Sequence, residues 1–270
     1  MLATCCRCAV IASLVATPAV AQSLSTADQI PQAPASPTGI FDSTPPQGPQ
    51  GSSSVSRFFR ATLNDFKQLP SHENLILAGV GGLAAASVRP MDPGVTQGLS
   101  SSRQMGDLFS PGEMLGSAAV QMAAAVATQV VGHTSGNRRV FALGSDLVRA
   151  QIVTQSLTLG IKLSVQRTRP DGTQYSLPSG HASTTFATAT VLQRHFGWKA
   201  GAPAYALATF VAASRVQVQR HYLTDVALGA TLGIIAGRTV TLGRGDTRFA
   251  LGPSVVPGGA GVNFTLVGRH

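Results

Sequence analysis

The sequence is poor in cysteine, in acidic residues and in aromatic residues. Only three of its 270 residues are cysteines, Cys5, Cys6 and Cys8. If that segment is removed, no disulfide and no catalytic thiol is available. Lys and Arg number 20 against 11 Asp and Glu, a formal net charge of +9 that favours anionic substrates or anionic lipid surfaces. Aromatic residues make up 6% of the chain and no Lys/Arg-rich run occurs, so a nucleic-acid partner is not expected.

The first 55 residues contain no segment that is expected to build a core. Residues 1–21 predict a secretory signal peptide, with Arg7 before a short apolar stretch and Ala19-Val20-Ala21 as the cleavage site before Gln22. A buried N-terminal helix is the alternative. Residues 22–55 are rich in Pro, Gln, Ser, Thr and Gly, which predicts a flexible or extended linker.

The remaining chain predicts one all-α domain at residues 56–245, a bundle of about six to seven helices. The expected helices span residues 57–68, 73–88, 112–134, 139–167, 181–196, 202–216 and 222–240. Prolines and Gly94 predict a break after the second helix, followed by a polar Ser/Gly-rich stretch to Pro111. Apolar residues on both sides of Pro257–Gly261 predict a short C-terminal β-hairpin in the tail, residues 246–270, which should pack on the bundle.

Long apolar runs are also scarce. Among the expected helices, only Met114–Asn137 lacks Asp, Glu, Lys and Arg over the roughly 20 residues that a membrane span needs. We therefore expect an exported protein, either a periplasmic globular bundle or one associated with a membrane on the periplasmic side, in preference to an integral protein. The sequence gives no indication of oligomeric state.

Three short motifs lie between positions 162 and 225. The first places Lys162 and Arg169 seven residues apart, two helical turns, so both point to one face near a helix end. In the second, Pro178-Ser179-Gly180 predicts a turn that starts a helix at about His181. Amides at a helix N-terminus favour an anion, and Gly180 lets the backbone approach a ligand closely. The sequence thus predicts a phosphate-binding site.

The third motif adds a further cation and a reactive imidazole. Arg215 offers a planar fork to phosphate oxygens. His221 and Asp225 are four residues apart and therefore neighbours on a helix face. Asp225 is expected to accept the Nδ1 proton of His221, leaving Nε2 free to attack phosphorus.

Together these motifs resemble the signature of the type 2 phosphatidic acid phosphatase superfamily, which also includes vanadium haloperoxidases and bacterial nonspecific acid phosphatases. The signature is filled by Lys162, Arg169, Pro170, Pro178, Ser179, Gly180, His181, Ser214, Arg215, His221 and Asp225. The resemblance covers roughly residues 60–245. It implies an all-helical bundle, a phosphohistidine intermediate, and His181 as the acid that protonates the leaving group.

The expected activity is metal-independent hydrolysis of phosphomonoesters, either lipid or isoprenoid phosphates or small soluble ones. No cofactor is expected, and vanadate should inhibit. Three alternatives stay open: a vanadium-dependent haloperoxidase with vanadate as cofactor, a phosphotransferase that uses the same oxyanion pocket, and a non-catalytic phosphate- or lipid-binding module.

Several other polar residues are expected to have no part in the site. Arg167 and Asp171 flank the first motif and are interpreted as a solvated loop. His72, His133, His195 and His270 have no partner at metal-ligand spacing, so no metal site is predicted.

Overall fold

The computed structural model describes residues 54–101, 103–242, 247–256 and 259–268. The predicted signal peptide and nearly all of the predicted linker lie outside these residues, so both stay predictions, as do the domain boundaries. The helices are α1 (Ser54–Gln68), α2 (His72–Val88), the 3-10 helix η1 (Arg89–Met91), α3 (Asp92–Ser100), α4 (Arg103–Phe109), α5 (Pro111–Leu115), α6 (Ala118–Thr134), α7 (Arg138–Val165), α8 (Gly180–Phe196), α9 (Trp198–Gln217) and α10 (Leu223–Val240). The prediction of an all-α fold is confirmed for residues 54–101 and 103–242.

The predicted number of helices is too low, because residues 89–115 hold four short helical segments. Pro90 and Pro93 lie in the first turns of η1 and α3, where the missing proline N–H costs no hydrogen bond. Prolines that predicted a break therefore begin new helices. The single helix expected at 112–134 is divided into α5 and α6, and the Ser117 hydroxyl caps α6 by accepting from the Val120 amide at 3.2 Å.

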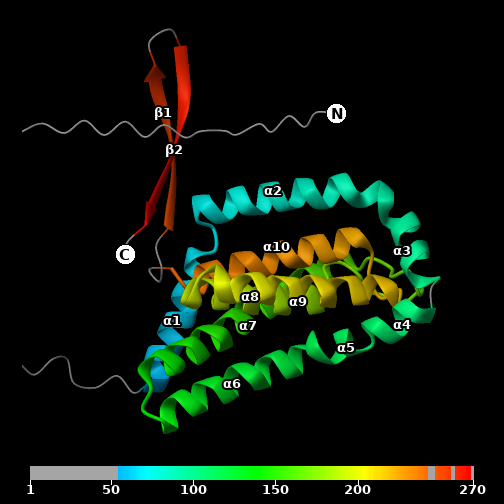
Figure 1. The fold of residues 1–270 in the computed structure, drawn as a ribbon, viewed down its shortest axis with the longest axis horizontal. Helices are drawn as coiled ribbons and strands as arrows, with labels where there is room; N and C mark the ends of the chain where they lie inside the picture. Colours follow the sequence, from blue (N-terminus) through cyan, green and yellow to red (C-terminus); the bar gives the residue numbers. More distant parts are fainter. Residues whose placement is uncertain (1–53, 102, 243–246, 257–258, 269–270) are drawn as a thin grey trace, which may run out of the picture. The chain divides into compact units, whose positions relative to one another are not determined.

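The long helices lie side by side and alternate in direction (Figure 1). α7 and α9 end where α8 and α10 begin, so the three motifs gather at one end of the bundle, here called the motif end. The opposite end, formed by the start of α7 and the ends of α6, α8 and α10, is called the basal end. Small apolar residues of α7, α8 and α10, among them Ala150, Val153, Ala187, Val191 and Ala236, form the core between the two ends.

Close packing of α10 on α8 fixes the third motif beside the second. A Cβ at Gly229 would lie 2.5 Å from the Ser179 carbonyl oxygen, and one at Gly233 would lie 2.3 Å from the Ser183 carbonyl oxygen. These glycines are four residues apart on α10, so they form a groove in which the backbone of α8 sits, as small residues do between membrane helices. The position of Ser179 relative to Asp225 depends on this contact.

Two helical stretches are long and apolar enough to cross a membrane, His72–Ser100 and Leu223–Val240. A third is available if Met105–Leu115 and Ala118–Thr134, bent by 51°, count as one. Only 11% of the apolar window within His72–Ser100 is buried in the protein, and Leu75, Val80 and Leu83 of α2 are exposed. Such a surface is typical of a membrane-associated protein.

The sequence favoured a globular bundle partly because Arg89 ends the apolar run of α2. In the structure, the helical path continues through Arg89 into η1 and α3, which makes the stretch long enough to span. These observations shift the preference from a soluble bundle towards a membrane-associated one.

Beyond the bundle, the backbone forms two antiparallel strands, β1 (Thr247–Val256) and β2 (Gly259–Gly268), with Phe249 opposite Leu266. The side chains of both strands and residues 257–258 lie outside the described part. The predicted packing of this tail on the bundle therefore stays a prediction.

The α8–α10 contact predicts opposite effects for two glycine substitutions. Gly233→Ala forces a Cβ against the α8 backbone and should lower the free energy of unfolding by about 1–3 kcal/mol. The matched control is Gly79→Ala on α2, where nothing lies within 4 Å of an added Cβ. That change should be neutral or stabilising by up to about 1 kcal/mol. Thermal unfolding of both variants in the same detergent measures the difference; equal midpoints would contradict the packing account.

Candidate active site

The first motif lies where α7 ends and the chain turns back. The Lys162 ammonium donates to the Tyr175 carbonyl at 2.5 Å, and Gln166 ends α7 with a left-handed backbone, φ 49°. The Arg169 amide donates to the Thr173 carbonyl at 2.7 Å, which closes a tight loop. Lys162 and Arg169 thereby face the same site from the helix and from the loop. Burial lowers the pKa of Lys162 to about 8, and the charge of Arg169 acts in the same direction.

The second motif starts α8 against α10. The fully buried Ser179 donates its amide to the Asp225 carbonyl at 2.9 Å, and its hydroxyl accepts from the Ala182 amide at 3.4 Å as the helix cap. A Cβ at Gly180 would meet only Thr158, at 3.9 Å. Packing within the protein therefore does not require a glycine here, and the space beside the backbone is free for a ligand.

His181 lies in the first turn of α8, beneath α5. Its Nε2 is 3.1 Å from the Glu113 carbonyl oxygen, and its ring lies where a Cβ at Gly116 would clash. Burial lowers the pKa of His181 to about 4, and the positive charge of Arg215 acts in the same direction. In the structure as it stands, the imidazole is therefore neutral at pH 7.

The two arginines of the motifs hold buried donors without partners. Arg215 is 4% exposed, and its Nε and Nη1 make no hydrogen bond; the Glu113 carboxylate is 3.7 Å from Nη1. The Nε of Arg169 is buried and unsatisfied in the same way. Leaving a buried donor unpaired costs about 1–3 kcal/mol. Positively charged donors that are buried and have no hydrogen-bond partner in the described part of the chain fit an oxyanion.

His221 and Asp225 are close, but the expected hydrogen bond is absent. The His221 Nδ1 lies 3.8 Å from Oδ2 of Asp225, an ion-pair distance that is too long for a hydrogen bond, and it has no other partner in the described chain. Oδ2 is occupied by the Tyr222 amide at 2.8 Å and by a short contact from the Ser176 hydroxyl. Burial lowers the pKa of His221, so the ring is neutral and its lone pair is available.

The structure thus brings all eight predicted site residues to the motif end. Lys162, Arg169 and Arg215 supply positive charge, Ser179 and Gly180 lie at the helix start, and the two histidines and Asp225 are the predicted reactive groups. Across the residues whose placement is described, no group of three or more His, Cys, Asp or Glu could hold a metal ion.

Residues 141–248 match the model of the PAP2 superfamily, and this segment contains every motif residue. The motif region of the chain is similar to the PAP2 superfamily over this segment, which is less than half of the chain. Its resemblance to the type 2 phosphatidic acid phosphatases, noted from the motifs, is thereby confirmed.

Three curated relatives resemble the PAP2 region. Identity is 41% over 80 residues with the lipid A 1-phosphatase of Porphyromonas gingivalis, covering 28% of this chain and 18% of the relative. Identity with the lipid A 4'-phosphatase of Helicobacter pylori is 28%, and the match covers 32% of this chain and 50% of the relative. Identity with the decaprenylphosphoryl-5-phosphoribose phosphatase of Mycobacterium tuberculosis is 34%, and the match covers 36% of this chain and 59% of the relative. The match thus spans less than two thirds of each relative.

Two solved structures are also similar. Aquifex aeolicus LpxE has a TM-score of 0.48 and 21% identity, covering 56% of this chain and 94% of that one. A transmembrane PAP2 type phosphatidylglycerolphosphate phosphatase from Bacillus subtilis has a TM-score of 0.44 and 19% identity, covering 68% and 92%.

Arg167 contacts the candidate site in a way that the sequence did not reveal, and its interpretation as part of a solvated loop is wrong. Its Nη1 donates to Oδ1 of Asp225 at 2.7 Å and its Nη2 donates to Oδ2 of Asp92 at 2.9 Å. Its guanidinium lies 4.3 Å from the centre of the Tyr222 ring. Arg167 therefore ties the loop of the first motif to the start of α10.

Asp92 completes this connection from α3. Its two oxygens accept from the amide and the hydroxyl of Thr224, at 2.9 and 2.8 Å. The sequence offered a signal for Arg167 alone: a carboxylate as deeply buried as Asp225 needs a cationic partner, and Arg167 is a cation within the first motif that had no assigned role. No spacing rule could have found Asp92.

Replacing Arg167 should impair the site without unfolding the bundle. Arg167→Ala removes a partner from two buried carboxylates and frees the loop that carries Arg169, so kcat for a phosphomonoester should fall by about 10²-fold. Arg167→Lys keeps the charge but loses the bidentate fork, so its loss should be smaller.

The control for this substitution is Arg238→Ala, which breaks a more exposed pair with Glu73 at the basal end, 3.1 Å. Turnover should stay within about twofold there, because exposed pairs contribute little. The measurements are kcat, KM and the thermal midpoint of all three variants. Equal kcat for Arg167→Ala and Arg238→Ala would contradict the positioning role.

Proposed function

We propose that this protein is a phosphatase that hydrolyses phosphomonoesters of lipids or isoprenoids through a phosphohistidine. The observation that carries the proposal is the set of unpaired buried donors of Arg169 and Arg215 around a buried, neutral His221. These donors favour a tetrahedral oxyanion held against a nucleophile. The named activities of the three curated relatives, all phosphatases of lipid or isoprenoid compounds, support the same chemistry.

In the first step, Lys162, Arg169, Arg215 and the amides at the start of α8 hold the phosphoryl oxygens, where charge spreads in the transition state. Nε2 of His221 donates its lone pair to phosphorus, and the bond from phosphorus to the leaving oxygen breaks. The departing oxygen takes a proton from His181, whose protonated form the bound phosphate charge favours. The products are a free alcohol and phosphorylated His221.

In the second step, a water molecule gives a proton to His181 and attacks phosphorus, the P–N bond breaks, and inorganic phosphate leaves. The Asp225 carboxylate stabilises the positive charge that the His221 ring carries while it is phosphorylated. The 3.8 Å distance between Nδ1 of His221 and Oδ2 of Asp225 shortens as the ring becomes positive. Cations of the protein neutralise the phosphate, so no metal ion is required.

A lipid or isoprenoid phosphate fits better than a soluble one because the bundle presents apolar surface. α2 and α6 expose Leu83 and Val130 along stretches that are long enough to cross a membrane. A substrate whose tail stays in the bilayer can then present its phosphate at the motif end.

We also propose that the motif end faces the periplasm. Arg60, Arg138, Arg139 and Lys199 lie at the basal end and take no part in the candidate site, and Lys and Arg near the ends of membrane helices favour the cytoplasmic side. If the helices cross the membrane in this orientation, α1 lies in the cytoplasm. If a signal peptide is cleaved, α1 instead lies in the periplasm. A single cysteine at Asn64, probed in intact cells with a membrane-impermeant thiol reagent, separates these orientations: labelling would contradict the one proposed.

The test of the function is phosphate release by the purified full chain in detergent. Its substrates are phosphatidic acid, an isoprenoid monophosphate and p-nitrophenyl phosphate. Release from the first two should persist in EDTA, fall with vanadate, and disappear in His221→Ala. Loss of activity in EDTA that Mg²⁺ restores would contradict the proposal. So would bromide oxidation with added vanadate and no phosphate release, because it would indicate a haloperoxidase.

A further inference from the structure

α1 has an inner line of residues that joins it to the basal end. Thr62 and Asp65 are buried, and Phe58 and Phe66 pack against the core. The Asp65 carboxylate pairs with Arg149 of α7 at 2.7 Å. In Figure 1, α1 crosses the ends of the long helices and does not run along them.

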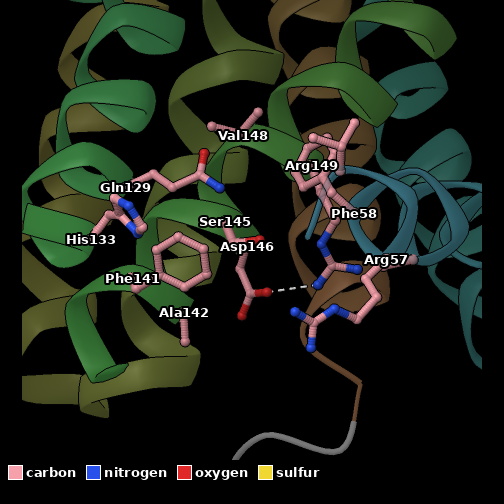
Figure 2. A pocket seen from close by; sticks show the side chains of 12 residues that line it. Arg57, Phe58, Gln129, His133, Phe141, Ala142, Ser145, Asp146, Val148 and Arg149 are labelled. Atoms are coloured by element: carbon pink, nitrogen blue, oxygen red, sulfur yellow. Dashed lines mark hydrogen bonds and ion pairs between the residues drawn. The ribbon is translucent and has the colours of Figure 1, made fainter. Parts of the chain in front are cut away.

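A cavity of about 730 Å³ separates the first turns of α1 from the end of α6 and the start of α7. Figure 2 shows Arg57, Phe58 and Arg149 on one side of it and His133 and Phe141 on the other. α1 thus rests on the bundle along its inner line, and its outer surface is turned away from the protein.

The outer surface of α1 carries an apolar stripe. Phe59 and Leu63 are 62% and 60% exposed, whereas Val55, one turn before Phe59, lines the cavity. Phe59 and Leu63 are spaced four residues apart, so they lie one above the other on the helix, and together they form the apolar stripe. Two large exposed apolar side chains in one row on a helix indicate a surface that lipid or another molecule covers.

Basic residues border this stripe, and no acidic residue does. Lys67 continues the line one turn beyond Leu63, and Arg60 follows Phe59. Asp65 is the only acidic residue of α1, and it is turned inward on Arg149. The outward surface of α1 therefore combines an apolar row with positive charge, and Arg138 and Arg139 add positive charge at the same end of the bundle.

We propose that α1 is an interfacial helix that lies on an anionic lipid bilayer at the basal end, opposite the motif end. Helices with an apolar row beside a basic one bind in the plane of a membrane, with the apolar row below the headgroups and the cations among them. Charge complementarity selects an anionic lipid surface over a neutral protein surface. Exposed apolar residues also occur on α2 and α6.

The absence of cysteine from residues 9–270 makes this testable with site-specific labels. The full chain with Cys5→Ser, Cys6→Ser and Cys8→Ser receives a single cysteine, Leu63→Cys on the stripe or Asn64→Cys as the matched control. Asn64 is the next residue and is exposed, but it lies on the polar side of α1. Each chain carries an NBD fluorophore and is placed in nanodiscs of phosphatidylcholine alone or with phosphatidylglycerol.

Emission from Leu63→Cys should be shifted to the blue in discs with phosphatidylglycerol, and doxyl-lipid quenching there should be at least about twofold stronger than at Asn64→Cys. Adding Arg60→Gln and Lys67→Gln should reduce the quenching in these discs and leave it nearly unchanged in neutral ones. The readout is independent of turnover, so it can fail while the phosphatase proposal stands.

Two outcomes would overturn the proposal. Equal emission and quenching at both positions would mean that the stripe faces water. A blue shift at Leu63→Cys without doxyl quenching would mean that protein, another copy or another segment of this chain, covers the stripe instead of lipid.

Discussion

The buried carboxylate of Asp225 is the constraint on which the site depends. Its side chain is fully buried, and a charge in that position needs close compensation. Arg167, Ser176 and the Tyr222 amide supply it, one from the loop of the first motif, one from just before α8, and one from the start of α10. Satisfying this one group therefore ties the loop that carries Arg169 to the start of α10.

The positively charged groups of the same site are arranged differently from this carboxylate. Asp225 is saturated with donors, whereas Arg169 and Arg215 keep buried donors that nothing in the described chain accepts. A protein that fixes its negative group and leaves its positive groups open is preorganised for an anion, because no reorganisation is needed when the anion arrives. Burial lowers the pKa of Lys162, His181 and His221, and a bound anion raises these pKa values again because its negative charge favours their protonated forms.

Sequence periodicity predicted the parts of the site that are local. The turn before His181 begins α8 as predicted, and all the motif residues lie at the motif end. The helical spacings were wrong in detail, because Arg169 lies in the loop after α7 ends at Val165 and His221 precedes α10, which begins at Leu223. Contacts between distant segments left no such pattern. Arg167 meets Asp92 across 75 positions, and α3, which carries Asp92, was taken for a loop because of prolines that begin helices.

The central claim is that His221 carries the phosphoryl group, and trapping that group tests it most directly. The full chain is mixed with a phosphomonoester labelled in its phosphate, stopped in alkali, where phosphohistidine survives, and digested for mass spectrometry. The account predicts a phosphate that is lost in acid, located on His221, absent from His221→Ala, and accumulated in His181→Ala, where water activation is lost. Label on His181 instead, or continued turnover in His221→Ala, would contradict it.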